Sequence, residues 1–324
     1  MKILVRLPNW LGDMVMSVGF IHQIPQFYPG SEVSVIVKKG IQDLLDFFPA
    51  VKHRFEFSKE EFSGLKGLVR FGSYIKETDN FDLFFCLPDS LSAAVMGAAT
   101  GSDRRIGYKK ELRQVLLTDS FSKPGGLHRV EEYLRLLELF TKKSAGPADV
   151  SLHHSFSKKD HIVVNINSEA SSRRLPIAKA VELLALLRSS IDRKIILIGA
   201  PKEKPFVQSV IDQLENRDNI DNLAGKTSLY QLSEVLATAR LMLTTDSGPA
   251  HLSNALGTHT VVLFGAGKES NTAPYRSDLR NIIRLGQLSC EPCLKNVCVR
   301  YATPQCLERL DSYRIVDTVK RHLN

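Results

Sequence analysis

Residues 241–252 read LMLTTDSGPAHL, and this stretch decides the fold. Its apolar start predicts the end of a buried strand, and the polar turn after it predicts the start of a helix. Asp246 or Ser247 can cap that helix, and Pro249 suits its first turn, where a missing N–H group costs little. The stretch therefore predicts a strand, a tight turn and a helix in succession.

The same turn predicts an anion-binding site. Backbone N–H groups near Gly248 would point at a phosphate, and His251 lies one turn further along the helix on the same side. The alternative is an ordinary capped connection that carries a buried histidine.

On both sides of this stretch, apolar runs alternate with helical patterns, which is typical of a parallel sheet covered by helices on both faces. Strands are predicted at residues 3–7, 32–37, 82–87, 162–166, 194–198, 220–223, 241–244 and 260–264. One helix is predicted to open at Asp13 and to kink or end at Pro25. The other helices are predicted at residues 41–48, 92–99, 130–140, 177–189, 204–214, 229–237, 249–255 and 313–322.

The chain of 324 residues is long enough for two domains, and a polar segment at 142–149, KKSAGPAD, is the predicted boundary. We therefore expect an α/β protein with two doubly wound parallel-sheet domains, residues 1–148 and 149–324, that face each other across a cleft. Ligands of such sheets bind beyond the carboxyl ends of the strands. The last helix is expected to pack back on the first domain.

The composition favours a protein that binds anions. The net charge is +8, from 43 basic and 35 acidic residues, and no apolar run approaches the roughly 18 residues of a membrane span. No export signal is visible, so a cytoplasmic protein is expected. Nucleic acid is a weak candidate partner, because the chain has no nucleic-acid motif and little aromatic interleaving.

Basic residues gather between positions 104 and 123. The gathering predicts either a solvated surface or a contact with substrate phosphates or an anionic membrane face. It comprises Arg104, Arg105, Lys109, Lys110, Arg113 and Lys123.

Four of the five cysteines cluster near the end of the chain. Cys290, Cys293, Cys298 and Cys306 have the spacing C-x2-C-x4-C-x7-C. Without an export signal, disulfides are not expected, which leaves reduced thiols or a small structural zinc site. Reduced thiols are favoured, because the spacing is not that of paired CxxC hairpins.

Three polar segments that follow predicted strands are candidates for chemistry. Asp13 is either a helix cap or a general base that takes a proton from an attacking hydroxyl. Arg173 and Arg174 lie in NSEASSRRLP at 167–176 and suit a diphosphate clamp or simply a charged loop. Glu203 suits either a contact to ribose hydroxyls or a helix start.

Common catalytic motifs are missing. The sequence contains no GxGxxG, Walker loop, HExxH or GxSxG. Dehydrogenases, P-loop enzymes, zinc proteases and hydrolases therefore lose their usual support.

Four segments together resemble the lipopolysaccharide heptosyltransferases, glycosyltransferase family 9. They are ILVRLPNWLGDMVMS at 3–17, LPDSLSAA at 87–94, RIGY at 105–108 and TTDSGPAHLSNALGTHTVVLFG at 244–265. PNWLGD is most similar to the type that adds the second heptose. The resemblance spans nearly the whole chain, and its motifs occur in the family's order.

The resemblance implies a GT-B fold with two Rossmann-like domains. It also implies transfer of L-glycero-D-manno-heptose from an ADP donor to the lipid-linked Kdo/heptose inner core of lipopolysaccharide, with inversion and without a metal or other cofactor. Such an enzyme would work as a monomer at the inner face of the cytoplasmic membrane. By resemblance the catalytic base is Asp13, the donor contacts are Ser168, Arg173, Glu203, Thr227, Asp246, Ser247, Gly248 and His251, and the acceptor contacts are Asn9, Arg104, Arg105 and Lys109.

The segment at 167–176 departs from the family pattern. Arg173 stands where the family has a lysine, Leu175 replaces a tryptophan, and Glu169 would repel a diphosphate unless it turns outward. Three alternatives therefore stay open. They are another GT-B sugar-nucleotide enzyme with a different donor, a 2-epimerase, and an inactive nucleotide- or glycan-binding protein.

Overall fold

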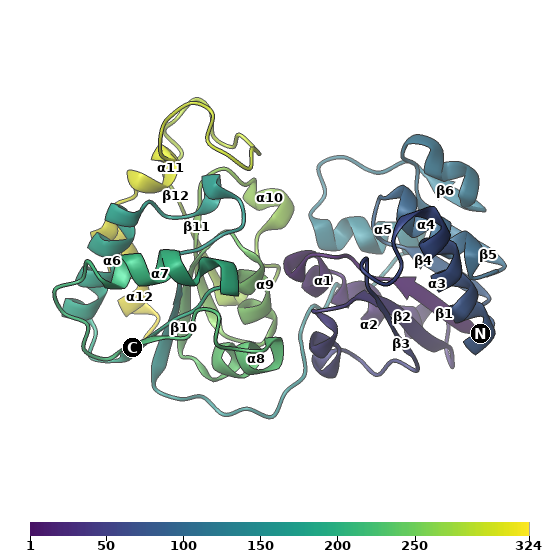
Figure 1. Cartoon of the computed structure of the whole chain (residues 1–324), viewed down its shortest axis with the longest axis horizontal. Coiled ribbons are helices and arrows are strands. Elements are labelled where there is room, and N and C mark those ends of the chain that lie inside the picture. Colours follow the sequence, from purple (N-terminus) through teal and green to yellow (C-terminus); the bar gives the residue numbers. More distant parts are fainter. Residues whose placement is uncertain (324) are drawn as a thin grey trace. The chain divides into compact units, whose positions relative to one another are not determined.

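A computed structural model describes residues 1–323 of the chain, so Asn324, the last residue of the predicted second domain, lies outside it (Figure 1). The chain forms two compact units, Met1–His153 and His154–Asn324. The boundary between the units lies between residues 153 and 154, whereas the sequence pattern predicted it between 148 and 149. Each unit is described by itself below.

The first unit contains a six-stranded parallel sheet with the order β3-β2-β1-β4-β5-β6. Its central strands are buried on both faces, as their continuous apolar runs predict. The strands are β1 (Lys2–Arg6), β2 (Glu32–Lys38), β3 (Arg54–Phe57), β4 (Leu83–Cys86), β5 (Arg104–Tyr108) and β6 (Asp119–Phe121).

Helices cover both faces of the first sheet. On one face α3 packs against α4, and on the other α1, α2 and α5 pack together. The helices are α1 (Leu11–Met16), α2 (Val18–Phe27), α3 (Gly64–Thr78), α4 (Leu91–Ala99) and α5 (Arg129–Thr141), with short 3-10 turns η1 (Gln42–Phe47) and η2 (Glu111–Leu116).

Two details of the first helix differ from the prediction. Trp10, and not Asp13, is the N-cap of α1, and Ser17 separates α1 from α2. Pro25 lies inside α2, which continues to Phe27, because a proline near a helix end disturbs few hydrogen bonds. Asp13 is therefore a residue of the first helical turn and not a capping residue.

The second unit repeats the topology of the first. Its six parallel strands have the order β12-β11-β10-β7-β8-β9, so in each sheet the first and fourth strands of the unit are the central neighbours. The strands are β7 (His161–Asn165), β8 (Lys194–Leu197), β9 (Ile220–Asn222), β10 (Leu241–Thr245), β11 (His259–Phe264) and β12 (Arg280–Arg284).

In Figure 1 the second sheet lies between a layer with α6, α7 and α12 and a layer with α8 and α9. The helices are α6 (Ile177–Ser190), α7 (Lys204–Ile211), α8 (Leu229–Thr238), α9 (Gly248–Ala255), α10 (Glu269–Thr272), α11 (Gln305–Glu308) and α12 (Ser312–Arg321), and the 3-10 turns are η3 (Ser171–Arg173), η4 (Pro201–Glu203) and η5 (Ser277–Leu279).

The last helix belongs to the second unit. Ile315, Val316 and Val319 of α12 join the apolar core beneath α6 and α7. The apolar face of α12 is therefore used within its own unit, which differs from the predicted packing on the first domain.

The shared strand order places a topological switch point between β1 and β4 in the first sheet and between β7 and β10 in the second. Doubly wound sheets bind ligands at this point, beyond the carboxyl ends of the strands. Within residues 1–323, no helix is long and apolar enough to cross a membrane.

Candidate functional site

The loops after β7 and β10 meet at the switch point of the second sheet. The Ser168 hydroxyl donates to the Asp246 carbonyl oxygen at 3.3 Å, and the Thr245 hydroxyl donates to the Asn167 carbonyl oxygen. The polar residues predicted on these two loops are therefore neighbours.

Two asparagines that the sequence did not single out organise this junction. The Asn165 amide donates to the Ser247 hydroxyl at 2.9 Å and to the Thr244 hydroxyl at 3.3 Å. The Asn167 amide donates to the Ile198 carbonyl oxygen at 2.9 Å, which extends the network to the end of β8. Buried amides in a connected network fix loop geometry, because each broken hydrogen bond leaves an unpaired polar group.

Asp246 and Arg173 form the charged centre of this site. Arg173 Nη1 lies 3.4 Å from Asp246 Oδ2, with the Asp246 carboxylate buried and the Arg173 side chain about one-third exposed. Burial raises the pKa of Asp246, and the nearby Arg173 and Arg284 guanidinium groups offset part of that effect. A partly exposed arginine beside a buried carboxylate leaves donor groups available to a bound anion.

The loop after β11 closes against the same carboxylate, which the sequence did not reveal. A Cβ atom on Gly267 would lie 2.1 Å from Asp246 Oδ2, so a larger residue there would displace the carboxylate or the loop. Arg284 holds this loop by donating to the carbonyl oxygens of Gly265, at 2.7 Å, and of Gly267. Its guanidinium also pairs with Glu269. The glycines in FGAG, directly after a strand, were the available signal.

The helix α9 starts at this junction. Ser247 is its N-cap, but within the described residues its side chain makes no capping hydrogen bond. Its hydroxyl donates instead to the Thr245 carbonyl oxygen at 3.1 Å. Gly248 begins the helix, and His251 is buried one turn later. The start of α9 therefore adjoins the Arg173 and Asp246 pair, and the strand, turn and helix follow one another as the stretch 241–252 predicted.

The remaining predicted donor contacts also follow strand ends. Glu203 is buried, and its Oε2 accepts a hydrogen bond from the Ala200 N–H at 2.7 Å, so this carboxylate caps the 3-10 turn η4 that leads into α7. Thr227 lies after β9, where Gly225 has a φ of 70°. Both positions are at the carboxyl edge of the sheet.

Two neighbours of Arg173 have structural contacts. The Arg174 guanidinium donates to the Ser168 carbonyl oxygen at 3.1 Å and lies 5.1 Å from the centre of the Phe206 ring. Glu169 pairs with Lys202 at 3.1 Å, with both side chains exposed. Glu169 is therefore turned outward, and Arg173 remains as the cation of the site.

In the first unit, Asp13 follows the carboxyl end of β1. Its Oδ1 lies 3.7 Å from Arg129 Nε, at the start of α5, and both side chains are about one-third exposed. A carboxylate must be ionised to accept a proton, and an adjacent guanidinium stabilises that form. The sequence did not reveal Arg129, because the contact joins residues of two distant helices.

A chain of ion pairs extends from this point along the same edge. Arg129 Nη1 lies 2.8 Å from Glu132 Oε2, and Lys123 Nζ lies 3.2 Å from the same oxygen. Lys123 also pairs with Asp89, which follows β4, at 2.8 Å. Charged groups of both signs therefore gather at the switch point of the first sheet.

Asn9 is held near the end of β1 by a buried arginine. Arg6 donates to the Asn9 side-chain oxygen and, at 3.3 Å, to the Ile36 carbonyl oxygen. Burial lowers the pKa of Arg6 to about 10. Asn9 thus lies at the same edge as Asp13, where an acceptor contact was predicted.

Two of the predicted acceptor contacts lie at the other edge of the first sheet. In the sheet register, Arg104 is level with Leu83 and Leu83 is level with Ile3, so Arg104 and Arg105 lie at the amino ends of the strands. Arg104 Nε also donates to Asp119 Oδ2 at 2.7 Å. Of these three basic residues, only Lys109, exposed after the end of β5, lies at the carboxyl edge of the sheet, which also carries Asp13. Arg104, Arg105 and Lys109 therefore do not form one group of acceptor contacts.

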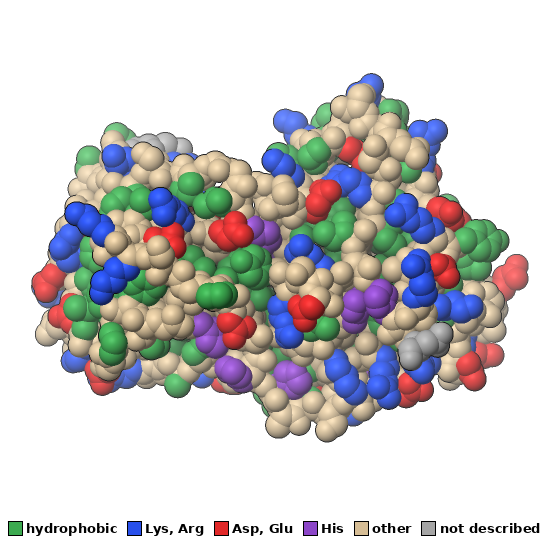
Figure 2. Space-filling view, turned by 180° about the vertical axis from the view of Figure 1, so that it is seen from behind, with side chains coloured by type: hydrophobic (Ala, Val, Ile, Leu, Met, Phe, Trp, Pro, Cys, Tyr) green, Lys and Arg blue, Asp and Glu red, His purple; other side chains and the backbone are tan. Residues whose placement is uncertain are grey.

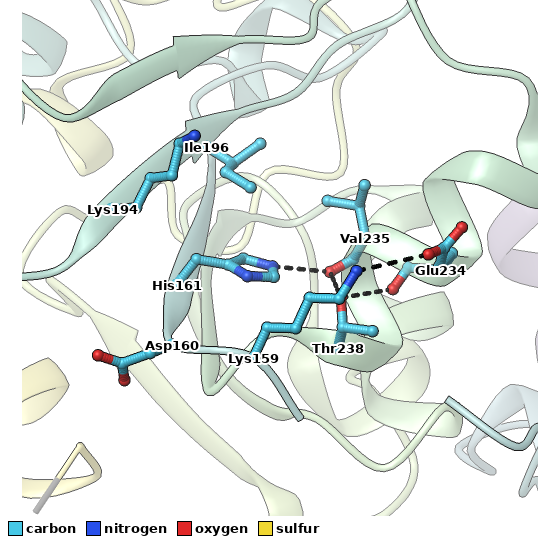
Figure 3. Close-up of a pocket in the computed structure, with 8 residues that line it drawn as sticks. All are labelled: Lys159, Asp160, His161, Lys194, Ile196, Glu234, Val235 and Thr238. Carbon is cyan, nitrogen blue, oxygen red and sulfur yellow. Dashed lines mark hydrogen bonds and ion pairs between the residues drawn. The ribbon is translucent and has the colours of Figure 1, made fainter. Parts of the chain in front are cut away.

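A surface pocket of about 360 Å³ lies at the amino edge of the second sheet (Figure 3). Its His161 ring points at the Val235 carbonyl oxygen, 3.1 Å away, and Lys159 Nζ lies 3.6 Å from Glu234 Oε1. His161 and Lys159 are thus paired within the lining, at the edge opposite Asp246, whereas Lys194 and Asp160 pair with Asp221 and Arg193 outside it. This pocket does not belong to the candidate site.

Charge is dispersed over the face shown in Figure 2, where basic side chains alternate with acidic ones. The net charge of +8 is therefore not gathered into one continuous basic surface on that face.

Comparisons with known proteins show the family of this chain. Residues 69–302 match glycosyltransferase family 9 (heptosyltransferase). The chain belongs to glycosyltransferase family 9. This glycosyltransferase is 24% identical to the lipooligosaccharide heptosyltransferase 2 of Campylobacter jejuni, over 99% of both chains. It is 25% identical to the lipopolysaccharide heptosyltransferase 2 of Escherichia coli, over 88% of both chains.

The glycosyltransferase also shares its fold with a solved structure, the ADP-heptose lipopolysaccharide heptosyltransferase II of E. coli. The two superpose with a TM-score of 0.82 at 24% identity, over 100% of this chain and 98% of that chain. The predicted fold class, GT-B with two Rossmann-like doubly wound units, is confirmed.

Proposed function

We propose that this glycosyltransferase moves L-glycero-D-manno-heptose from ADP-heptose to the inner core of lipopolysaccharide, with inversion of the anomeric carbon. The observation that carries the proposal is the meeting of three strand-end loops at Arg173 and Asp246, beside the start of α9. The relatives named for lipopolysaccharide heptose transfer support the sugar and the acceptor.

The donor diphosphate would bind at the start of α9. As the bond between the sugar and ADP breaks, the diphosphate gains negative charge, which Arg173 and the first N–H groups of the helix would stabilise. Asp246 holds Arg173 at 3.4 Å and, as an acceptor, suits a sugar hydroxyl. No divalent ion is required for this charge balance, so we propose metal-independent transfer.

Asp13 would act as the general base. The acceptor hydroxyl attacks the anomeric carbon from the face opposite the departing diphosphate and loses its proton to the Asp13 carboxylate. The new glycosidic bond forms as the bond to ADP breaks, and the anomeric configuration inverts. Arg129, 3.7 Å from Asp13, keeps the carboxylate in the charged form that this step needs.

The acceptor is lipid-linked in this proposal, so the enzyme would act at the inner face of the cytoplasmic membrane. Exposed Leu112 and Val115 on η2, next to Lys109 and Lys110, support a peripheral contact with anionic lipid. These side chains are three residues apart and lie on the same side of a 3-10 turn.

Product analysis with a donor panel tests the proposal. The protein is incubated with ADP-heptose, ADP-mannose or UDP-N-acetylglucosamine, with and without a heptose-bearing inner-core acceptor, and products are identified by mass spectrometry and NMR. We expect heptose transfer from ADP-heptose only, with an inverted linkage and without added divalent ions. Transfer from another donor, epimerised donor without transfer, or binding without turnover would each contradict the proposal.

A further inference from the structure

Four thiols surround one small pocket in the second unit. Its volume is about 20 Å³, which is room for a single water-sized particle or ion. All four cysteines are free, with one buried and three partly exposed. The pocket is lined by Cys290, Cys293, Cys298 and Cys306, together with Glu291 and several uncharged residues.

The carboxylate in this lining has an unused oxygen. The Glu291 side chain is only 4% exposed, and its Oε1 has no hydrogen-bond partner in the described part of the chain. Its Oε2 accepts a hydrogen bond from the Gly286 N–H at 2.8 Å and lies 3.6 Å from Arg284 Nη1. A buried carboxylate oxygen without a partner is costly, and a cation would satisfy it.

The segment that carries three of these thiols has little support of its own. No helix or strand lies between β12 and α11, and Leu294, Val297 and Val299 are each more than 60% exposed. Long segments without secondary structure are uncommon in a compact unit, and a bound ligand can hold such a segment in one conformation.

We propose that this pocket binds one thiophilic divalent cation, with Zn²⁺ as the test ion, through the four cysteine thiolates and with Glu291 beside it. Thiolate sulfurs bind zinc at about 2.3 Å in a tetrahedral arrangement. Within residues 1–323, no three His, Cys, Asp or Glu side chains already converge on a metal position. Binding therefore draws the partly exposed loop thiols inward toward the buried Cys306.

The cation would also position the donor site, a step that rests on the proposed function. The Ser172 N–H donates to the Asn296 carbonyl oxygen at 3.2 Å, and the Leu294 N–H donates to the Ala266 carbonyl oxygen at 2.9 Å. Ser172 directly precedes Arg173, so the cysteine loop fixes the backbone beside the cation of the diphosphate site. Arg173 would thus be held from one side by Asp246 and from the other by the metal-bound loop.

Metal analysis of the full chain tests the site. The protein is expressed with added zinc and purified under reducing conditions. Its zinc content per chain is then measured by elemental mass spectrometry. We expect about one Zn²⁺ per chain in the wild type. In the Cys293→Ser, Cys298→Ser double variant, the zinc content should be at least roughly tenfold lower. Cys86→Ala, which removes a buried thiol of the first unit outside the pocket, is the matched control and keeps its metal.

Titration of the metal-free wild type with Co²⁺ covers the case in which the double variant does not fold. A thiolate-to-cobalt charge-transfer absorption that saturates at one equivalent supports the site. The proposal would be overturned if the purified protein held no Zn²⁺ and the titration gave no such absorption. Disulfides among the four cysteines in intact-protein mass spectra would also overturn it.

Kinetics separate this proposal from the proposed function. We expect the double variant to raise the KM for the ADP donor roughly tenfold, with a smaller change in the KM for the acceptor. Bound zinc with an unchanged donor KM would refute the positioning step. Bound zinc in a protein that transfers no heptose would refute the proposed function and leave the metal site standing.

Discussion

Arg129 Nε lies 3.7 Å from Asp13 Oδ1 and joins the start of α5 to the first turn of α1. Burial lowers the pKa of Arg129, but the neighbouring Tyr133, Glu132 and Asp13 outweigh that effect and raise it. The attraction is mutual, so the ionised form of Asp13 gains from the same contact. This pair gives the proposed base a fixed cationic neighbour.

Arg129→Met should move the acid limb of the pH profile to higher pH. Without the cation, the Asp13 carboxylate is protonated at a higher pH, and a protonated carboxyl group cannot act as a base. We expect kcat/KM on the acid limb to fall by roughly threefold, as for a partly exposed ion pair. ADP release across a pH series measures the limb, and Arg135→Met, which removes an arginine paired with Glu138 on the same helix, is the control. An unshifted limb would remove Arg129 from this role.

Asp13→Asn should separate binding from chemistry. The amide keeps the size of the side chain but cannot take a proton, so transfer should fall by roughly 10²- to 10⁴-fold. Donor affinity, measured by calorimetry with ADP, should stay unchanged, because the proposed donor contacts belong to the second unit. A variant that retained full transfer would show that another group accepts the proton.

Gly267→Ala should damage the donor site through a single methyl group. The added Cβ would lie 2.1 Å from Asp246 Oδ2 and 3.3 Å from Phe264 Cε1, so the carboxylate or the loop must shift. We expect ADP affinity to fall roughly tenfold or more, since misplaced site groups cost about that much. Gly125→Ala is the matched control, because a Cβ there meets no atom within 4 Å. Equal affinity in both variants would mean that this loop does not shape the site.

Asp246→Asn should stabilise the ligand-free protein at neutral pH while weakening donor binding. Burial raises the pKa of Asp246 despite Arg173, so the ionised carboxylate costs stability in the folded state. That cost appears as the pH rises from the ordinary aspartate value of about 3.9 through the raised folded value, and it persists above it. Thermal unfolding should therefore show a higher Tm for the variant at pH 7 and equal Tm values below about pH 3.5. A lower Tm at pH 7 would mean that the pair with Arg173 outweighs the burial.

The central strands and the edge strand β9 were predictable from the sequence, whereas β3, β5, β6 and β12, at or next to the sheet edges, were not. Buried strands such as β10, LMLTT, are continuous apolar runs. In contrast, β5 begins with two arginines, β6 is only three residues long, and β12 reads RNIIR. Strands near or at a sheet edge carry polar side chains, so their pattern resembles that of a loop. The sequence therefore predicted the central strands, whose carboxyl ends carry the candidate site, better than the strands at the sheet borders.

The candidate site shows the same division. The turn at Asp246 could be found because strand ends in parallel sheets share an edge. The partners Arg129, Arg284 and Gly267 act through contacts between distant segments, which no local pattern records. The cysteine spacing was visible, but the unpaired Glu291 oxygen beside the thiols required the fold.

Lys109 and Arg104 should differ in their effect on the acceptor, although both belong to one basic segment. Lys109 follows the carboxyl end of β5, the edge that carries Asp13, whereas Arg104 starts that strand and pairs with Asp119. The strand has five residues, which separates its ends by roughly 13 Å. A phosphate bound near Asp13 is therefore within reach of only one of them.

We accordingly expect Lys109→Met to raise the acceptor KM by roughly threefold to tenfold, as for loss of one charge-assisted contact. Arg104→Met should leave the acceptor KM unchanged and instead lower Tm slightly, because Asp119 loses its partner. Steady-state kinetics with a phosphorylated inner-core acceptor measure both variants, and a dephosphorylated acceptor should remove the effect of Lys109→Met. If Arg104→Met gave the larger rise in KM, the acceptor would bind at the amino edge of the sheet, and Asp13 would be too far away to act as its base.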